Sequence, residues 1–167
     1  LEAERTVIES GLDYTILRYA NVYGPRQNPA GEAGVVAIFS RQMLAGERPT
    51  IFGDGTKTRD YVYVDDIVVA NLLAMAEKRA AGRVYNLGRG REVSDRQIFE
   101  LVRGAVGATL EPIAASKRPG EIDRICLDAS LAKAELGWEP TILLEEGISR
   151  TVAFYQADVT HRARESR

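Results

Sequence analysis

Short segments rich in β-branched and aromatic residues alternate with helical segments along most of the chain. The pattern predicts a buried strand over Tyr14–Tyr19 that runs into a loop ended by Gly24-Pro25. The stretch from Val35 to Gly46 has helical spacing and stops at a glycine. The order of these segments has no regular strand–helix–strand rhythm. It favours the end of a parallel α/β sheet with a small α/β lobe attached.

The remaining segments complete this interpretation. The other expected elements are a helix over 1–10, strands over 49–52, 59–64, 83–88 and near 125–127, and helices over 66–79, from Ser94, over 128–137 and over 144–157. Ser94 and Gln97 have the spacing of a capping box. Residues 1–157 are expected to form the folded unit, and residues 158–167 a polar, frayed tail. Because the first segment is helical and its first residue is leucine, we expect the sequence to be the C-terminal part of a longer protein.

The charge and cysteine content argue against several classes of protein. The net charge of −2 gives no electrostatic case for binding nucleic acid or an anionic membrane. Cys126 and His161 are the single cysteine and histidine, so no cluster has metal-ligand spacing. No apolar run in the sequence is long enough for a membrane span. We therefore expect a metal-free protein in the reducing cytoplasm.

The common catalytic and phosphate-binding motifs are absent from the sequence. It contains no G-x-G-x-x-G turn, no Walker A motif and no G-x-S-x-G elbow. No lysine follows a tyrosine by four residues, because Gly53, Ala74, Ile113 and Ala129 occupy those positions. The residues alone therefore indicate a chain that holds a ligand and carries no catalytic residue.

Four segments in order carry a resemblance to a known family. They are LRYANVYGPRQ, IFGDGTKTRDYVYVDD, VYNLGRG and RPGEIDRICLDASLAKAELGWEP. Together they resemble the C-terminal half of the extended short-chain dehydrogenases, which are NAD-dependent sugar-nucleotide epimerases and dehydratases. The UDP-glucose 4-epimerase type is most similar, since the dehydratases typically read RPGHD where this chain has Arg118-Pro119-Gly120-Glu121. The resemblance covers nearly the whole chain, to about Tyr155.

The resemblance implies a Rossmann-like fold, an NAD cofactor bound mainly by an N-terminal half, a UDP-sugar substrate and a homodimer. In the complete enzyme a tyrosine takes the proton of the sugar 4-hydroxyl while the C4 hydride passes to NAD. The 4-keto sugar then rotates, and the hydride returns to its other face. This chain would supply the grip on the nucleotide diphosphate. Two alternatives remain: a dehydratase, decarboxylase or reductase acting on a similar nucleotide sugar, and a non-catalytic relative that senses a nucleotide.

Two arginines and two of their neighbours are the main substrate-binding candidates. Arg59 lies between a turn and a strand, and the resemblance implies that its forked guanidinium contacts the diphosphate. Tyr61 shares its strand face and is either a nucleotide contact or a half-buried tyrosine. Arg118 matches the family's second phosphate-binding arginine. Glu121 matches an acidic residue that accepts hydrogen bonds from the ribose hydroxyls, with Asp123 as a less favoured alternative.

The end of the first strand and the start of the second helix hold the other candidates. By resemblance, Asn21 reaches the substrate, and the Tyr19–Ala20 backbone lies near the nicotinamide, so these three residues are the cofactor-binding candidates. Many epimerases carry phenylalanine in place of Ala20, which leaves the shape of the sugar pocket open. Val35 and Val36 either pack in the core or cover the phosphates at a helix N-terminus.

Asp65, Asp66 and Trp138 are assigned to structure. An acidic pair before a helix is the pattern of an N-cap and a first turn. Trp138 is expected to pack under the last helix.

Overall fold

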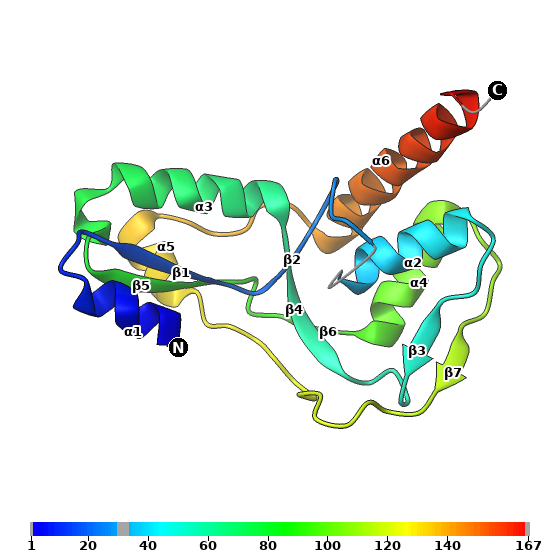
Figure 1. Cartoon of the computed structure of the whole chain (residues 1–167), viewed down its shortest axis with the longest axis horizontal. Helices are drawn as coiled ribbons and strands as arrows, with labels where there is room; N and C mark the ends of the chain where they lie inside the picture. Colours follow the sequence, from blue (N-terminus) through cyan, green and yellow to red (C-terminus); the bar gives the residue numbers. More distant parts are fainter. Residues whose placement is uncertain (1, 30–33, 166–167) are drawn as a thin grey trace.

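The computed structural model describes residues 2–29 and 34–165 and the side chains of these residues to position 160. The chain forms an elongated α/β structure in which two regions are joined by a central three-stranded sheet (Figure 1). The region around the first strand is called the sheet region here, and the region that contains the last helix is called the lobe.

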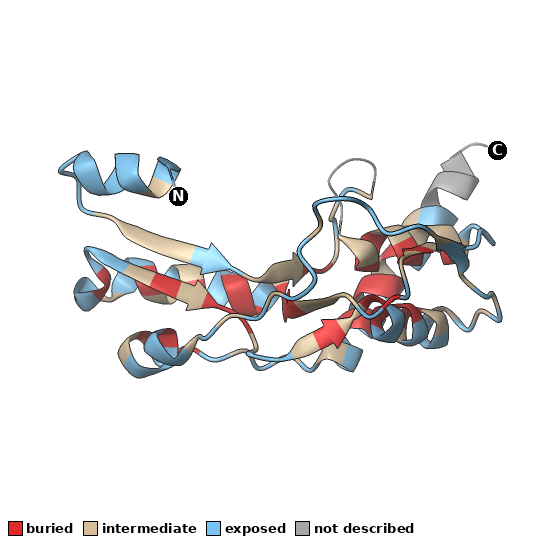
Figure 2. Cartoon of the chain, turned by 90° about the horizontal axis from the view of Figure 1, so that it is seen from below, coloured by how far each residue is buried: buried red, intermediate tan, exposed pale blue. Residues whose placement is uncertain are grey.

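Two parallel strands, two α-helices and the short 3-10 helix η1 (Lys78–Ala80) contribute to the core of the sheet region. Strand β1 (Thr15–Tyr19) pairs in parallel with β5 (Arg83–Leu87), and the helices are α3 (Val64–Ala76) and α5 (Ser130–Leu136). Alanines of both helices pack against Tyr85 and Leu87. Helix α1 (Glu2–Glu9) has no buried residue and lies at one end of the region (Figure 2).

The lobe consists of three helices and a short pair of strands. The helices are α2 (Val35–Leu44), α4 (Asp95–Val106) and α6 (Leu144–Glu165), and β3 (Thr50–Phe52) pairs in parallel with β7 (Ile113–Ala115). Side chains from all three helices form one core, in which Phe39 and Phe99 meet edge to face. Helix α4 begins with the expected capping box between Ser94 and Gln97.

The central strands join the two cores. Strand β4 (Thr58–Tyr63) pairs in parallel with β2 (Asn21–Tyr23) and antiparallel with β6 (Glu92–Ser94). Its side chains alternate, so Val62 enters the core of the sheet region while Tyr61 and Tyr63 enter the core of the lobe. The expected strand face is therefore confirmed to Tyr63, whereas Val64 begins α3. The α/β class and the parallel strands match the prediction.

Two buried aspartates connect distant segments. The Asp60 carboxylate accepts hydrogen bonds from the backbone N–H groups of Arg89 (2.9 Å), Gly90 (3.1 Å) and Leu127 (3.3 Å). Asp66 accepts hydrogen bonds from the Thr141 N–H and hydroxyl and from the Ile142 N–H. Asp66 is thus structural, as expected.

Several expectations about local structure need correction. The N-cap of α3 is Tyr63, and Asp65 and Asp66 lie in its first turn. Trp138 packs in the core of the sheet region, where its Nε1 donates to the Asp66 carbonyl, and not under α6. Strand β1 is half-buried because it has a neighbouring strand on one side only among the described residues.

Other differences concern the bounds of elements. The strand expected near residues 125–127 is absent, because that segment makes one isolated bridge between Thr58 and Arg124. Helix α6 continues past Ala157 to Glu165, since no glycine or proline interrupts that stretch. The turn expected over residues 26–34 lies partly outside the described residues. Within the described part of the chain, no helix is long and apolar enough to cross a membrane, and no acidic, histidine and cysteine side chains cluster as metal ligands.

Candidate functional site

A cavity of about 430 Å³ lies where α2, the β3–β4 turn and the loop over residues 116–124 meet. It contains most of the substrate-binding candidates. The residues that line it are Asn21, Gly34, Val35, Ile38, Phe39, Gln42, Thr50, Phe52, Lys57, Arg59, Tyr61, Asp95, Arg118 and Glu121. Of the seven predicted substrate-binding residues, only Val36 is not part of this lining.

Two guanidinium groups reach the cavity from different elements. Arg59 lies on β4, and one of its nitrogens donates to the Thr58 carbonyl at 2.7 Å. The Arg118 guanidinium lies 3.7 Å from the centroid of the Phe52 ring, which is a stacking contact. Neither group forms an ion pair with the residues that the structure describes. Two such cations can bind an anionic group from both sides.

Glu121 is held by Lys57, a residue that the sequence analysis did not select. The Lys57 Nζ lies 3.0 Å from Glu121 Oε2 and 3.4 Å from Asp95 Oδ2. The hydrogen bond from Lys57 lowers the pKa of Glu121, and the positive charges of Arg118 and Arg59 lower it further. Burial raises the pKa of Asp95, an effect that Lys57 opposes. Glu121 is therefore an ionised hydrogen-bond acceptor at neutral pH.

Asn21 and Tyr61 lie side by side on paired strands. They are opposite each other in the register of β2 and β4. Tyr61 is almost fully buried, and its burial raises the pKa of its hydroxyl well above the usual range. The tyrosine is therefore neutral at physiological pH and can act only as a neutral donor or acceptor.

Val35 and Val36 differ in the direction that their side chains face. Val35 lines the cavity at the first turn of α2, while the Val36 side chain is completely buried in the core of the lobe. The helix begins beside the cavity, so its N-terminal dipole favours an anion there.

The cofactor candidates Tyr19 and Ala20 lie at the carboxyl end of β1, next to Asn21. Ligands of open α/β sheets bind at this end of the strands. The Tyr19 hydroxyl donates to Asn71 Oδ1 at 3.0 Å, and the Ala20 N–H donates to the Leu87 carbonyl at 2.9 Å. Tyr19 is 45% exposed, so its outer surface is open to a ligand.

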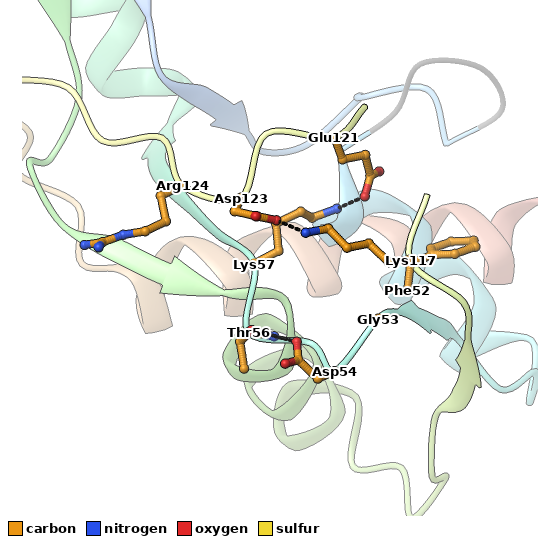
Figure 3. A pocket seen from close by; sticks show the side chains of 9 residues that line it. All are labelled: Phe52, Gly53, Asp54, Thr56, Lys57, Lys117, Glu121, Asp123 and Arg124. Carbon is orange, nitrogen blue, oxygen red and sulfur yellow. Dashed lines mark hydrogen bonds and ion pairs between the residues drawn. The ribbon is translucent and has the colours of Figure 1, made fainter. Parts of the chain in front are cut away.

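A second cavity of about 410 Å³ adjoins the first and shares Phe52, Lys57 and Glu121 with it. Figure 3 shows the nine residues that line this second cavity. Asp123 lines this second cavity and pairs with Lys117. Of these two acidic residues, only Glu121 also lines the first cavity, and the preference for Glu121 as the ribose contact remains a prediction.

The comparisons with known proteins agree with this architecture. A solved UDP-glucose 4-epimerase from Thermotoga maritima, with UDP-glucose, is 50% identical and superimposes with a TM-score of 0.88 over 95% of this chain and 50% of that chain. A Thermus thermophilus UDP-glucose 4-epimerase in complex with NAD is 38% identical, with a TM-score of 0.81 over 93% of this chain and 50% of that chain. The fold is thus that of one half of a nucleotide-sugar enzyme.

The sequence profile of the NAD dependent epimerase/dehydratase family matches residues 2–88, and the chain belongs to this family. A UDP-glucose 4-epimerase of Mycolicibacterium smegmatis is 49% identical over 87% of this chain and 46% of the relative. A dTDP-glucose 4,6-dehydratase of Streptomyces griseus is 34% identical over 89% of this chain and 44% of the relative. The chain spans about half the length of these curated relatives.

Lys57 and Asp95 are charged residues of the candidate site that sequence reasoning missed. A signal for Lys57 was present, because residues two apart share one face of a strand and Lys57 precedes Arg59 and Tyr61 at that spacing. Asp95 follows the capping serine of α4, where an acidic residue has an ordinary structural explanation.

Proposed function

We propose that this chain is the sugar-nucleotide-binding part of an NAD-dependent UDP-sugar 4-epimerase. The observation that carries the proposal is the gathering of Asn21, Arg59, Tyr61, Arg118 and Glu121 around one cavity from separate elements of the chain. The similarity to UDP-glucose 4-epimerases, at 49–50% identity against 34% for a dehydratase, favours epimerisation over dehydration.

Each group in the cavity has a role suited to a nucleoside diphosphate. Arg59 and Arg118 bind the diphosphate, and the first turn of α2 at Val35 adds a favourable dipole. Glu121 accepts hydrogen bonds from the ribose hydroxyls. Asn21 offers an amide that can both donate and accept near the sugar. With the nucleotide fixed in this way, the sugar can turn over while it remains attached.

NAD is the cofactor of the family, and it supplies hydride transfer when bound. The carboxyl end of β1 fits such a group, since Tyr19, Ala20 and Asn21 occupy the edge at which α/β sheets bind nucleotides. These residues would border the cofactor on the side that faces the substrate cavity. The N-terminal half of the complete enzyme is proposed to hold most of it.

The 167-residue chain alone is expected to have no turnover, because its sequence has no Tyr-x-x-x-Lys pair. The complete protein is proposed to be cytoplasmic and homodimeric; both remain predictions. A tyrosine and lysine at that spacing in the complete protein would support an enzyme, and their absence would support a nucleotide sensor.

Product analysis tests the proposal. The protein that carries this chain is incubated with UDP-glucose and NAD, and the products are separated by chromatography. The proposal expects UDP-galactose as the only product. A 4-keto-6-deoxy sugar nucleotide would instead identify a dehydratase, and measurable turnover by the isolated chain would contradict the assignment of the chemistry to residues outside it.

A further inference from the structure

Lys57 lies between two carboxylates that belong to different parts of the lobe. Asp95 begins α4 and is almost fully buried, and Glu121 lies in the loop over residues 116–124. The Asp95 N–H also donates to the Lys57 carbonyl at 3.1 Å. The backbone and the side chain of Lys57 are therefore both tied to the start of α4, which is a fixed part of the lobe.

The loop that carries Glu121 is joined to the scaffold on either side of that residue. Before it, the Gly53 N–H donates to the Ala115 carbonyl at 2.8 Å. After it, the Thr58 N–H donates to the Asp123 carbonyl at 2.9 Å. The hydrogen bond from Lys57 to Glu121 adds a connection at the acidic side chain itself, and Figure 3 shows it as a dashed line.

The charges around Lys57 indicate that it pairs with carboxylates and not with a phosphate. Its ammonium faces two carboxylates at 3.0 and 3.4 Å, so its positive charge is already balanced. Arg59 and Arg118 are the cations that remain for a phosphate. Lys57 contacts Oε2 of Glu121, and a carboxylate has about four lone-pair sites on its two oxygens, so Oε1 keeps its capacity to accept.

We propose that Lys57 is a positioning residue that fixes the Glu121 carboxylate toward the ribose and so sets the preference of the site for nucleotides with ribose hydroxyls. This inference rests on the proposed function, because it takes Glu121 as the ribose contact. It goes further by assigning the preference for ribose hydroxyls to the two ion pairs that Lys57 forms, one with Asp95 and one with Glu121. Mutation of a residue that acts on the ribose changes the ratio of the affinities for nucleotides with and without ribose hydroxyls. Mutation of a phosphate-binding or purely structural residue changes both affinities by the same factor.

The test compares UDP with 2′,3′-dideoxy-UDP by calorimetry on the complete protein. The wild-type protein is expected to bind UDP about tenfold to a hundredfold more tightly, the value of one charge-assisted hydrogen bond. Lys57→Met is expected to reduce this ratio on the order of fivefold while the affinity for dideoxy-UDP changes less than about twofold. Lys117→Met is the matched control, since Lys117 lies in the loop that carries Glu121 but pairs with Asp123. Its ratio should equal that of the wild type.

An equal loss of affinity for both nucleotides in Lys57→Met, or an unchanged ratio, would overturn the inference. If Lys57→Met does not fold because Asp95 loses its partner, the Lys57→Met/Asp95→Asn variant removes the unpaired charge and the same ratio is measured. Absence of UDP binding by the wild type would contradict the proposed function. UDP binding without any ribose preference would contradict this inference and the ribose role of Glu121, and it would leave the proposed binding of the diphosphate by Arg59 and Arg118 unaffected.

Discussion

The sheet region and the lobe differ in how completely they bury the apolar side chains of their helices. In the lobe, the three helices bury their apolar side chains in one core, and a cavity lies at the edge of that core between α2, strands β3 and β4 and the loop over residues 116–124. In the sheet region, α3 buries Ala70 and Ala74 but leaves Leu72 60% and Met75 84% exposed. The strands of parallel α/β sheets are normally buried on both faces, whereas β1 here is only half-buried. The lobe therefore contains the candidate binding cavity, and the sheet region presents a surface that we expect to pack against further protein.

This difference predicts that core mutations in the two regions separate stability from binding. Trp138→Ala in the sheet region should lower the free energy of unfolding by about 3–5 kcal/mol, because a buried indole is replaced by a cavity. The UDP affinity of the folded protein should stay within about twofold. Urea unfolding and calorimetry measure the two quantities.

Phe99→Ala in the lobe is the matched comparison. Phe99 packs against Phe39, which lines the cavity, so a similar loss of stability should come with weaker UDP binding. Equal effects of the two variants on UDP affinity would remove the distinction between the regions.

Mutation of Asp66, which connects the two regions, is expected to have the next largest effect on the free energy of unfolding. Asp66→Ala removes the acceptor for three hydrogen bonds from residues 141 and 142, which join α3 to the segment that leads into α6. The free energy of unfolding should fall by about 2–3 kcal/mol. Asp65→Ala at the neighbouring exposed position is the control, with a change within about 0.5 kcal/mol. A loss of the same size in both variants would argue against the connection.

Mutation of the exposed face of α3 should have the smallest effect on the free energy of unfolding and a measurable effect on self-association. The isolated chain is expected to self-associate or to be only marginally stable. Leu72→Ser and Met75→Ser together should reduce association in sedimentation velocity, with stability changed by less than about 1 kcal/mol. Gln156→Ser, at an exposed position on α6, serves as the control. A wild-type chain that is already stable and monomeric would show that this face needs no cover.

The sequence predicted the parts of the fold that local patterns determine. The strand at residues 83–87, the capping box at Ser94 and the alternation of Tyr61 and Val62 each follow from short-range periodicity or spacing. Strand β7 was missed because its three residues pair with β3 more than sixty positions earlier, a contact that no local pattern encodes. Trp138 was placed under the wrong helix for the same reason: its partner, the Asp66 carbonyl, is distant in sequence.

The candidate site divides in the same way. Arg59, Arg118 and Glu121 were found because whole motifs around them resemble a known family. The role of Lys57 depends on Asp95 and Glu121 reaching it from a helix and a loop that only the folded chain brings together. Val36 could not be separated from Val35 in the sequence, since the two differ only in the direction that each faces on α2.

The central claim is that Arg59 binds the diphosphate of a UDP-sugar in the lobe cavity. UDP affinity is measured by calorimetry for the complete wild-type protein, for Arg59→Ala and for Arg91→Ala, whose side chain is exposed and lies outside both cavities. Loss of one charge-assisted contact should weaken UDP binding about tenfold to a hundredfold in Arg59→Ala and leave Arg91→Ala unchanged. Equal UDP affinity in all three proteins would contradict the claim.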